Sequence, residues 1–327
     1  MDIVYASDER FAQILCTSLI SLLESNREED ITVHILDDSI TKESKNLLQA
    51  VADRYSTHLN FIPLPDLDEL AGQKIDSTRW AKTTFGRLFL PIIAPNLERI
   101  IYIDCDTLVL ENLSYLMQMK LPERSSCAAV VECMGDLHKA NVGLRPEDPY
   151  FNAGVMLIDL NKWRKENVVK RFSQCIQRRK GCVPYVDQGV INEVLRGEIA
   201  VLPPKYNVMT VCYDFDYIEM QRYRRTKYPY ERQEYTAAKK NPTIVHFTTS
   251  FLSRRPWISA KQTHPFAEKW REYKSMTPWS EASLWKDNRG MLKKGYEMLC
   301  NILPRSIAVG MSGFLHSTVK AARERDK

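Results

Sequence analysis

The chain has 327 residues, of which 44% are hydrophobic and 27% are charged. These proportions are ordinary for a folded globular protein, so they exclude the disordered and fibrous classes. The formal charge of +5 comes from the end of the chain, because residues 289–327 hold 8 of the 46 Lys and Arg but only 3 of the 41 Asp and Glu. The main body has no net charge, which argues against nucleic acid as a partner.

The N-terminal sequence, MDIVYASDER, lacks a basic region ahead of an apolar stretch, and no run reaches the roughly 18 apolar residues of a membrane-spanning helix. The eight cysteines are scattered without a CxxC pair. This spacing is typical of reduced thiols rather than of a disulfide framework or a zinc site. Together these features predict a cytoplasmic protein.

The first hundred residues alternate strand and helix patterns. "DIVYA" predicts a strand, and apolar residues then recur at helical spacing from Phe11 to Leu23. "ITVHIL" predicts a second strand, residues 41–55 a helix with Thr41 as its cap, and "LNFIPL" a third strand. This order predicts a parallel sheet that binds ligands at the carboxyl ends of its strands, and Asp8 follows the first of them.

The next segments continue the alternation. "TTFGRLFLPIIAP" predicts a helix, and "RIIYI", "CAAVVE" and "YFNAGVMLIDL" predict strands. A helix is expected from about Asn161 to the basic "QRRKG", and another in "YVDQGVINEVLRG", ended by Gly197. "PTIVHF" is the last clear strand. No period of 20 to 50 residues repeats, so a solenoid is excluded.

The segment "IYIDCDTLVL" places two aspartates, Asp104 and Asp106, at the end of an apolar run. On an extended backbone their side chains project to one face, and Cys105 to the other. Two carboxylates on one face suit a hard divalent cation. The pair fits the DxDxT signature of haloacid dehalogenase-type phosphatases and the DxD metal site of nucleotide-sugar glycosyltransferases, and it also fits two solvated acids in a turn.

Position along the chain argues against the phosphatase interpretation. Such an enzyme carries its nucleophile near the start of the domain and a second acidic motif well downstream. Here three predicted strands precede the pair. The only later "GD", Gly135-Asp136, comes too soon and lacks the second acid.

Six segments occur in the order and approximate spacing of glycosyltransferase family 8. They are "MDIVYASDERF", "TTFGRLFLP", "IYIDCDTLV", "YFNAGVMLIDLNKWR", "YVDQGVIN" and "IVHF" with "RPW". Over about residues 1–270 the chain therefore resembles the galactosyl- and glucosyltransferases related to glycogenin. The resemblance implies an α/β fold of the GT-A type, a Rossmann-like nucleotide-sugar-binding sandwich with a mixed central sheet. Residues 271–327 are then expected to form a helical, basic C-terminal extension.

The resemblance also implies a metal site. Asp104, Asp106 and His246 match the family's metal ligands, which would suit Mn²⁺, with Mg²⁺ as the alternative. A bound ion would stabilise the negative charge that builds on the departing diphosphate. Three side chains could add a cationic contact to the same phosphates: Arg254, Arg255 and Lys205. The chain departs from the family here, because Thr249 and the loop "SFLSRRPW" replace a glycine followed by Lys-Pro-Trp.

The donor-binding residues follow from the same match. Ala6 and Asp8 match residues that hold the uracil and ribose. Phe11 either stacks on the base or packs its helix against the core. The sugar-side positions are Arg87, Asn152, Ala153, Gly154, Asp187 and Gln188. Asp104 and Arg255 complete the expected donor contacts at the diphosphate.

Two residues are candidates for the chemical step. The family retains anomeric configuration, so a double displacement would need a nucleophile on the sugar face opposite the diphosphate. The amide of Gln188 is a poor nucleophile. We therefore favour a front-face route in which the leaving diphosphate helps to deprotonate the acceptor hydroxyl and Gln188 steadies an oxocarbenium-like centre. Asp187 is the alternative nucleophile.

The two basic segments near the end leave alternatives open. Residues 221–240 mix basic and aromatic residues, as a solvated face, an acceptor-site lid or a nucleic-acid site would. The tail from residue 289 combines apolar clusters with Lys and Arg, and Pro304 interrupts any single helix. It can lie on the anionic inner face of a plasma membrane, or cap the domain.

The predicted enzyme is thus a metal-dependent retaining hexosyltransferase that uses a UDP-hexose and a glycan or glycolipid acceptor, without nucleic acid as a partner. A nucleotide-sugar-binding protein without turnover is the non-enzyme alternative, and the altered loop around Thr249 is its best support.

Overall fold

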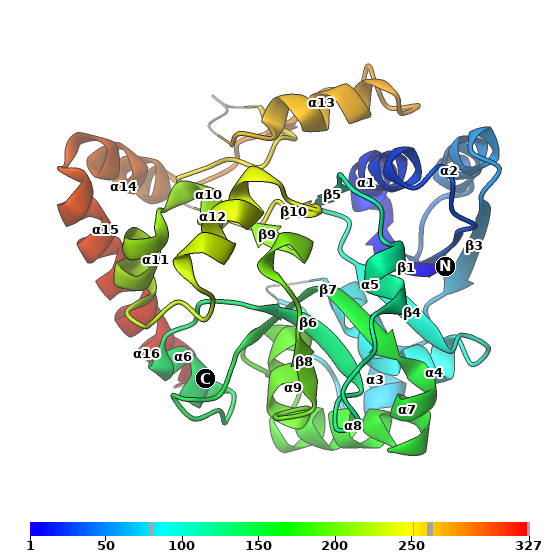
Figure 1. Ribbon diagram of the computed structural model, residues 1–327, viewed down its shortest axis with the longest axis horizontal. Helices are drawn as coiled ribbons and strands as arrows, with labels where there is room; N and C mark the ends of the chain where they lie inside the picture. The colour runs from blue at the N-terminus through cyan, green and yellow to red at the C-terminus, as the bar shows by residue number, and fades with distance from the viewer. Residues whose placement is uncertain (79–80, 251, 260–263, 326–327) are drawn as a thin grey trace.

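A seven-stranded sheet forms the centre of the computed structural model, which describes residues 1–78, 81–250, 252–259 and 264–325 (Figure 1). The strand order is β3-β2-β1-β4-β7-β6-β8. The strands are β1 (Asp2–Asp8), β2 (Thr32–Asp38), β3 (His58–Pro63), β4 (Arg99–Ile103), β6 (Cys127–Val131), β7 (Phe151–Asp159) and β8 (Ile199–Val201).

The strand directions place two chain segments at one edge of the sheet. β1 pairs in parallel with β2 and β4, and β2 with β3, as the strand-helix alternation predicts. β7 runs antiparallel to β4 and β6, so the mixed sheet of a GT-A fold is confirmed. Because β4 and β7 are antiparallel, the carboxyl end of one meets the amino end of the other. Just past this end, the Asp104 amide donates to the Gly154 carbonyl at 2.8 Å.

One helical layer covers the face of the sheet near β1 to β3. The Thr41 hydroxyl accepts from the Ser44 amide at 3.2 Å, so the predicted cap is confirmed. The Asp8 carboxylate likewise caps a short 3-10 turn. This layer consists of η1 (Glu9–Phe11), α1 (Ala12–Ser25) and α2 (Lys42–Arg54).

The other face carries a thicker layer of short helices (Figure 1). The single helix expected from Asn161 is wrong, because Asn167 adopts a left-handed conformation (φ 52°) and divides it into α7 and α8. "TTFGRLFLP" forms mostly a 3-10 helix. The layer contains α3 (Leu67–Ala71), η2 (Lys82–Phe89), α4 (Leu90–Ile93), α7 (Leu160–Lys165), α8 (Val168–Arg178) and α9 (Val186–Val194).

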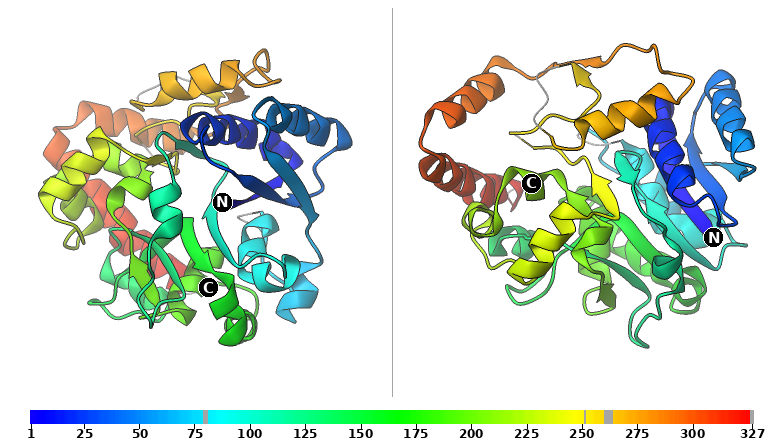
Figure 2. Two further views of the ribbon diagram at one scale, coloured as in Figure 1. Left: turned by 45° about the vertical axis from the view of Figure 1, so that its right-hand side comes forward. Right: turned by 45° about the horizontal axis from the view of Figure 1, so that its top comes forward.

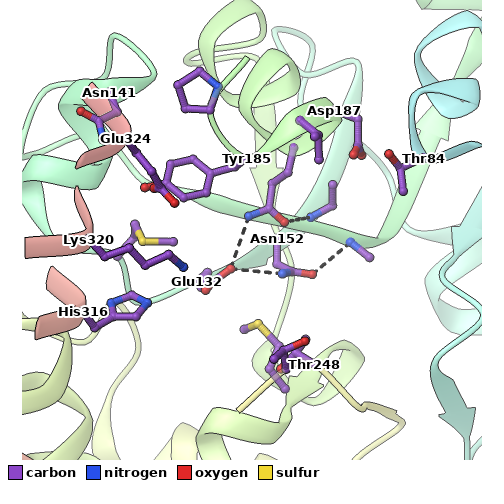
Figure 3. Close-up of a pocket in the computed structure, with 18 of the residues that line it drawn as sticks. Thr84, Glu132, Asn141, Asn152, Tyr185, Asp187, Thr248, His316, Lys320 and Glu324 are labelled. Atoms are coloured by element: carbon purple, nitrogen blue, oxygen red, sulfur yellow. Dashed lines mark hydrogen bonds between the residues drawn. The ribbon is translucent and has the colours of Figure 1, made fainter. Parts of the chain in front are cut away.

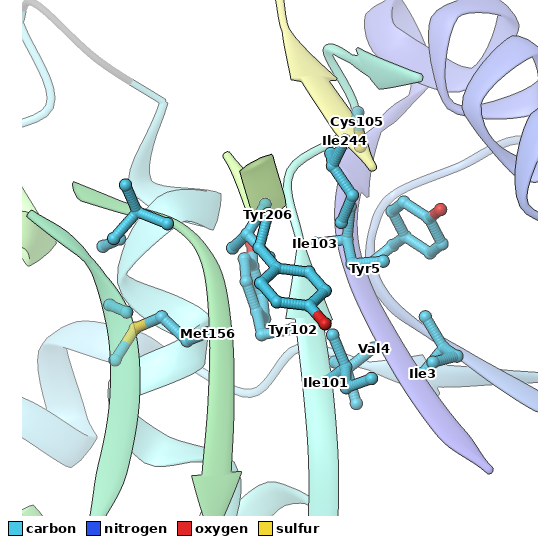
Figure 4. Packing of buried hydrophobic residues seen from close by; sticks show 14 of the residues in the cluster. Ile3, Val4, Tyr5, Ile101, Tyr102, Ile103, Cys105, Met156, Tyr206 and Ile244 are labelled. Carbon is cyan, nitrogen blue, oxygen red and sulfur yellow. The ribbon is translucent and has the colours of Figure 1, made fainter. Parts of the chain in front are cut away.

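The hydrophobic core lies along the middle strands of the sheet. Ile101, Tyr102 and Ile103 on β4 are at most 1% exposed, and they pack beside Tyr5 of β1 and Met156 of β7 (Figure 4). Both faces are apolar because helices cover both, which is the pattern of a buried parallel sheet. The core therefore fixes the end of β4, where the two aspartates begin.

A second, small sheet brings a distant histidine to those aspartates. β10 (Ile244–His246) runs antiparallel to β5 (Thr107–Val109) and parallel to β9 (Val208–Met209). His246 lies opposite Thr107, and the Phe247 amide donates to the Asp106 carbonyl at 2.8 Å. Register in this sheet therefore fixes where the histidine points.

The basic and aromatic segment 221–240 forms two helical stretches joined by residues 225–231, and its tyrosines are internal. Tyr223, Tyr228, Tyr230 and Tyr235 are each less than 9% exposed and contact one another or Phe215. Their rings contribute to the core. The surrounding elements are α5 (Ser114–Gln118), α6 (Asp136–Asn141), η3 (Pro204–Tyr206), α10 (Thr210–Asp214), α11 (Tyr217–Arg224) and α12 (Arg232–Lys240).

The C-terminal elements run from α1 across to α11 and α6 (Figures 1 and 2). Pro304 ends one helix and begins the next, as expected from the sequence. Among the described residues, no helix is both long and apolar enough to cross a membrane. The elements are β11 (Ile258–Ser259), α13 (Ala267–Ser275), β12 (Trp285–Lys286), α14 (Met291–Ile302), α15 (Arg305–Phe314), the π-helical η4 (Leu315–Lys320) and α16 (Ala321–Arg325).

Close backbone contact holds α15 against α11. A Cβ atom on Gly313 would lie 2.8 Å from the Arg222 carbonyl oxygen and 2.9 Å from that of Tyr223. Only glycine allows this approach, since backbone atoms cannot move aside as a side chain can. The Asn141 amide also donates to the Ala321 carbonyl at 2.9 Å. The segment after Pro304 is thus packed on the body of the protein.

We predict that Gly313→Ala loosens α15, because the added methyl group forces the two backbones apart. The expected cost is about 1–3 kcal/mol of unfolding free energy, typical of overpacking. Gly295→Ala is the matched control, since the added Cβ meets open space on α14. Limited proteolysis with mass spectrometry should show faster cleavage near residue 313 in the first variant alone. Equal cleavage in both would contradict the close packing.

Candidate active site

Three side chains from two segments meet at the end of β4. His246 Nε2 lies 3.1 Å from Asp106 Oδ1 and 3.8 Å from Asp104 Oδ2. One ligand atom from each of the three falls within 4.8 Å of the others. The structure therefore brings together the residues predicted to hold a metal ion, although 140 positions separate Asp106 from His246.

The donor set fits a divalent cation. His246 Nδ1 donates to Asn207 Oδ1 at 3.0 Å, which turns Nε2 toward the two carboxylates. Metal-binding histidines are usually oriented by such a bond from the other ring nitrogen. A Cβ on residue 154 would lie 2.2 Å from His246 Cε1 and 2.9 Å from Asp104 Oδ2. Gly154 therefore leaves room for the His246 ring and the Asp104 carboxylate.

The electrostatics of the triad favour the ionised form of Asp106. Burial disfavours the charged forms of both Asp106 and His246, yet each carboxylate–imidazole contact outweighs it. The pKa of Asp106 is lowered by His246 and Arg255, and the pKa of His246 is raised by Asp106 and Asp104. Asp106 is therefore ionised and available as an oxygen ligand.

Of the three cations proposed near the phosphates, Arg255 reaches the site. Its guanidinium lies 2.9 Å from Asp106 Oδ2. Arg254 pairs instead with Glu297, and Lys205 lies 3.3 Å from Glu111. Thr249 lines the cavity beside the triad. Phe251, within the altered loop, lies outside the described residues.

Arg87 links the triad to α9. Its guanidinium lies 2.7 Å from Asp104 Oδ1 and 2.9 Å from Asp187 Oδ2, above the ring of Tyr102. Arg87 also donates to the Ala153 carbonyl. Burial raises the pKa of Asp187 to about 6 despite this partner. One guanidinium thus joins two of the other residues predicted to face the sugar, Ala153 and Asp187, to the metal ligand Asp104.

The start of α9 has an unusual backbone. Tyr185 and Val186 both have positive φ angles, 61° and 49°, which are costly for residues with a side chain. A Cβ on Gly189 would lie 1.8 Å from the Pro184 carbonyl oxygen. This tight entry points Asp187 and Gln188 into the cavity, and strain of this kind is often found at functional sites.

The amides of Gln188 and Asn152 are held in defined orientations (Figure 3). Gln188 Oε1 accepts from the Ala153 amide at 3.1 Å, and Nε2 donates to the Tyr150 hydroxyl at 3.0 Å. Asn152 Oδ1 accepts from the Gly154 amide at 3.0 Å and from Asn207 at 2.8 Å. Both Nδ2 of Asn152 and Nε2 of Gln188 then face the carboxylate of Glu132.

Sequence reasoning missed Glu132, Asn207 and Arg224. Glu132 accepts from Asn152 at 3.1 Å and from Arg224 at 3.0 Å, and the two charged side chains are 11% and 8% exposed. Arg224 also donates to His316 Nε2 at 3.3 Å. Side-chain hydrogen bonds therefore run without a break from His246 through these residues to the C-terminal segment. Nothing in the sequence around "CAAVVE" marked its final acid as part of this chain of contacts.

The residues matched to the nucleoside lie at the end of β1. Ala6 and Asp8 do not line the main cavity, and the Ala6 carbonyl accepts from Cys105 Sγ at 3.1 Å. Phe11 is half-buried against Trp285, with ring centroids 5.4 Å apart. The Cys105 contact places Ala6 beside the aspartate turn, and the roles of Ala6, Asp8 and Phe11 toward a nucleoside stay predictions.

The cavity that contains the site has a volume of about 1470 Å³. The triad, Arg87, Arg255, residues 152–154 and residues 187–188 lie along its wall. A site with paired carboxylates, an imidazole and convergent amides at the end of a mixed α/β sheet is that of a GT-A-type glycosyltransferase.

Comparison with known proteins agrees with this class. The sequence profile described as Glycosyl transferase family 8 matches residues 2–260. The chain therefore belongs to glycosyl transferase family 8, and it is a glycosyltransferase. The phosphatase interpretation of the aspartate pair is thereby set aside.

Individual relatives show the breadth of the family. The chain is 27% identical to General stress protein A of Bacillus subtilis over 286 residues, covering 86% of this chain and 95% of that one. It is 24% identical to Lipopolysaccharide 1,2-glucosyltransferase of Escherichia coli, covering 85% and 79%. Among solved structures, galactosyltransferase LgtC with donor and acceptor sugar analogs superposes with a TM-score of 0.71 at 23% identity, covering 90% and 99%.

We predict that Asn207→Ala weakens manganese binding by about 10–100-fold, the usual effect of removing a hydrogen-bond partner of a ligating histidine. The imidazole would lose the bond that orients Nε2. Titration calorimetry with Mn²⁺ measures the change, and Asn112→Ala at an exposed turn serves as control. An unchanged affinity would show that Asn207 does not orient the ligand.

Proposed function

We propose that the protein is a metal-dependent retaining glycosyltransferase that moves a hexose from a UDP-hexose to a hydroxyl of a glycan or glycolipid. The observation that carries this proposal is the meeting of Asp104, Asp106 and His246 with the amides of Asn152 and Gln188 in one cavity of a family 8 enzyme. Relatives named lipopolysaccharide glucosyltransferase and galactosyltransferase support glucose or galactose as the sugar.

The diphosphate end of the donor would lie at the triad. Asp104, Asp106 and His246 would hold Mn²⁺, or Mg²⁺ as the alternative, and the bound ion stabilises negative charge on the diphosphate. Arg255, 2.9 Å from Asp106, would be the protein's cationic contact to the phosphates. A guanidinium matches phosphate oxygens in a bidentate manner, so it would orient the donor as well as attract it.

The sugar end of the donor would face the wall formed by Arg87, residues 152–154 and Asp187. These residues offer hydrogen-bond donors and acceptors that converge on one part of the cavity. Gly154 allows close approach, and the Ala153 amide is fixed by Gln188. Ala6 and Asp8 at the end of β1 would hold the uracil and ribose.

Hydrogen bonding at Gln188 supports a front-face reaction. Oε1 already accepts from the Ala153 amide, and the Asp187 carboxylate is neutralised by Arg87 at 2.9 Å. Both facts lower the nucleophilicity of these groups. We therefore assign Gln188 the stabilisation of the oxocarbenium-like centre. The leaving diphosphate would accept the proton of the incoming hydroxyl, so the sugar–phosphate bond breaks as the new glycosidic bond forms on the same face.

The C-terminal extension, residues 271–327, supports a peripheral position on the inner face of the plasma membrane. Met291, Leu292 and Ile302 on α14 are 89%, 91% and 69% exposed, and Ile307 on α15 is 53% exposed. Exposed apolar side chains beside Lys and Arg are the features of segments that lie on anionic lipid. A cytoplasmic enzyme would reach a glycolipid acceptor at that membrane surface.

We predict that UDP binding depends on manganese, because the diphosphate completes the coordination begun by the triad. Asp106→Asn should remove that dependence by replacing an ionised ligand. Fluorescence or calorimetric titration of UDP, with Mn²⁺ and with a chelator, measures it. Equal affinity under both conditions in the wild type would contradict the assignment.

The same assay separates enzyme from binding protein. Incubation with Mn²⁺ and labelled nucleotide sugars should release UDP and free sugar slowly when no acceptor is present. Tight donor binding without release would indicate a nucleotide-sugar-binding protein without turnover.

We predict that Gln188→Ala lowers single-turnover transfer by about 10²–10³-fold, the loss typical of one oriented polar group, rather than abolishing it. Its amide bears no full charge and is held by three partners. Gln188→Glu tests whether a carboxylate at that place changes the route. A sugar–protein adduct on residue 188 or on Asp187, trapped and located by mass spectrometry, would overturn the front-face route.

A further inference from the structure

The cavity is larger than a donor site requires. Its volume of about 1470 Å³ exceeds the roughly 300–1,000 Å³ of single small-molecule sites. The triad and the residues matched to the sugar occupy one end. The other end is lined by Glu132, Tyr185 and residues of the C-terminal segment, including His316, Lys320 and Glu324 (Figure 3). A second ligand therefore has room beside the donor.

The C-terminal wall of this far end is firmly held. The His316 carbonyl accepts from His138 Nε2 at 2.9 Å, and the ring of His316 accepts from Arg224. Ser317 donates to the Tyr223 carbonyl at 3.0 Å. Burial lowers the pKa of both histidines, so they are neutral and add no charge. The wall therefore presents fixed groups to whatever enters.

Most charges that line the far end are compensated. Arg224 lies 3.0 Å from Glu132, and Arg289 lies 2.8 Å from Asp287. Arg179 lies 2.7 Å from Glu193. The Glu324 carboxylate has Tyr185 and His138 as neighbours. The three ion pairs add no net charge, whereas Glu324 faces a phenol and a neutral imidazole and brings one negative charge to the far end.

Two lysines are the exception. Lys320 on η4 and Lys293 on α14 line the cavity, and within the described part of the chain their ammonium groups have neither a hydrogen bond nor an ion pair. Figure 3 shows the Lys320 side chain directed into the cavity toward Glu132. Two lysines against the single carboxylate of Glu324 leave the balance of these groups positive, although the pocket as a whole carries both signs.

We propose that the far end of the cavity is an acceptor subsite, completed by the C-terminal segment, that takes a sugar bearing a phosphate or carboxylate group, with Lys320 and Lys293 as its anion contacts. This rests on the proposed function, because the donor end defines which ligand the far end receives. Ordered aromatic and polar groups around Tyr185 would hold the sugar ring, as in most small-molecule sites.

The test uses the full-length protein saturated with Mn²⁺ and UDP, so that the diphosphate position is filled. Glucose 1-phosphate, glucuronic acid and neutral methyl α-glucoside are titrated by saturation-transfer NMR. We expect the two anionic sugars to bind about fivefold to tenfold more tightly than the neutral one, the gain of a charge-assisted hydrogen bond. Equal affinity of all three in the wild type would overturn the proposal.

Variants assign the preference to the lysines. Lys320→Gln and Lys293→Gln should each reduce it at least about twofold, and the double variant should remove it, whereas Lys320→Arg should retain it because the charge remains. Lys294→Gln on α14 and Arg323→Gln on α16 are matched controls outside the cavity lining, and should bind as the wild type does. A preference that survives in the double variant would refute the subsite.

Failure of the donor assignment can be told apart from failure of the subsite. UDP affinity with Mn²⁺ is measured first in every variant. If UDP does not bind the wild type, the proposed donor function fails, and the same titrations without UDP still decide the subsite. If the preference for anionic sugars is present without UDP and lost with it, the anion was bound at the diphosphate position and the subsite is wrong.

Discussion

The buried guanidinium of Arg87 is the interaction on which the site depends. It balances Asp104 at the end of β4 and Asp187 at the start of α9, and it donates to Ala153 on β7. Its desolvation is costly, and two carboxylates with a carbonyl oxygen compensate it. Removing one partner of such a buried group typically costs about 3–5 kcal/mol, because the remaining charges are left unpaired. Arg87 therefore holds β4, β7 and α9 in fixed positions relative to one another.

The sheet explains why those elements meet. In a wholly parallel sheet the start of a neighbouring strand would lie at the opposite edge from the aspartates. β7 runs antiparallel to β4, so residues 152–154 begin where Asp104 ends. The second sheet adds His246 through the register of β10 with β5. Strand direction thus brings the metal ligands and the sugar-facing amides together.

The strands and helix ends that depend on neighbouring residues could be predicted from the sequence. Apolar periodicity predicted the strands β1 to β4 and β7, Thr41 marked a helix start, and Pro304 marked a break. The helix expected from Asn161 was wrong because Asn167 adopts a left-handed conformation, which no apolar pattern reveals. The triad and the sugar-side residues came from matched family segments rather than from periodicity.

Long-range polar contacts had no such signal. Glu132 reads as an ordinary acid after a strand, and Arg224 as one of several basic residues in a helical stretch. Each becomes informative only when the fold places them 3.0 Å apart in a buried position. Likewise, the basic tail was expected to cap the domain or to lie on a membrane, whereas its inner side also lines the cavity.

One carboxylate determines the orientation of several groups across the cavity. Since Asn152 Oδ1 accepts from Gly154 and Asn207, its amino group must face Glu132. Glu132 accepts at both carboxylate oxygens, and Arg224 is its ion-pair partner.

The same logic extends to the C-terminal segment. His316 must be neutral to accept from Arg224, and burial lowers its pKa accordingly. Removing one member of this buried network would leave a donor or acceptor of its neighbour unpaired, which is costly. The docking of η4 and the orientation of the amides at the donor end are therefore parts of one hydrogen-bonded arrangement.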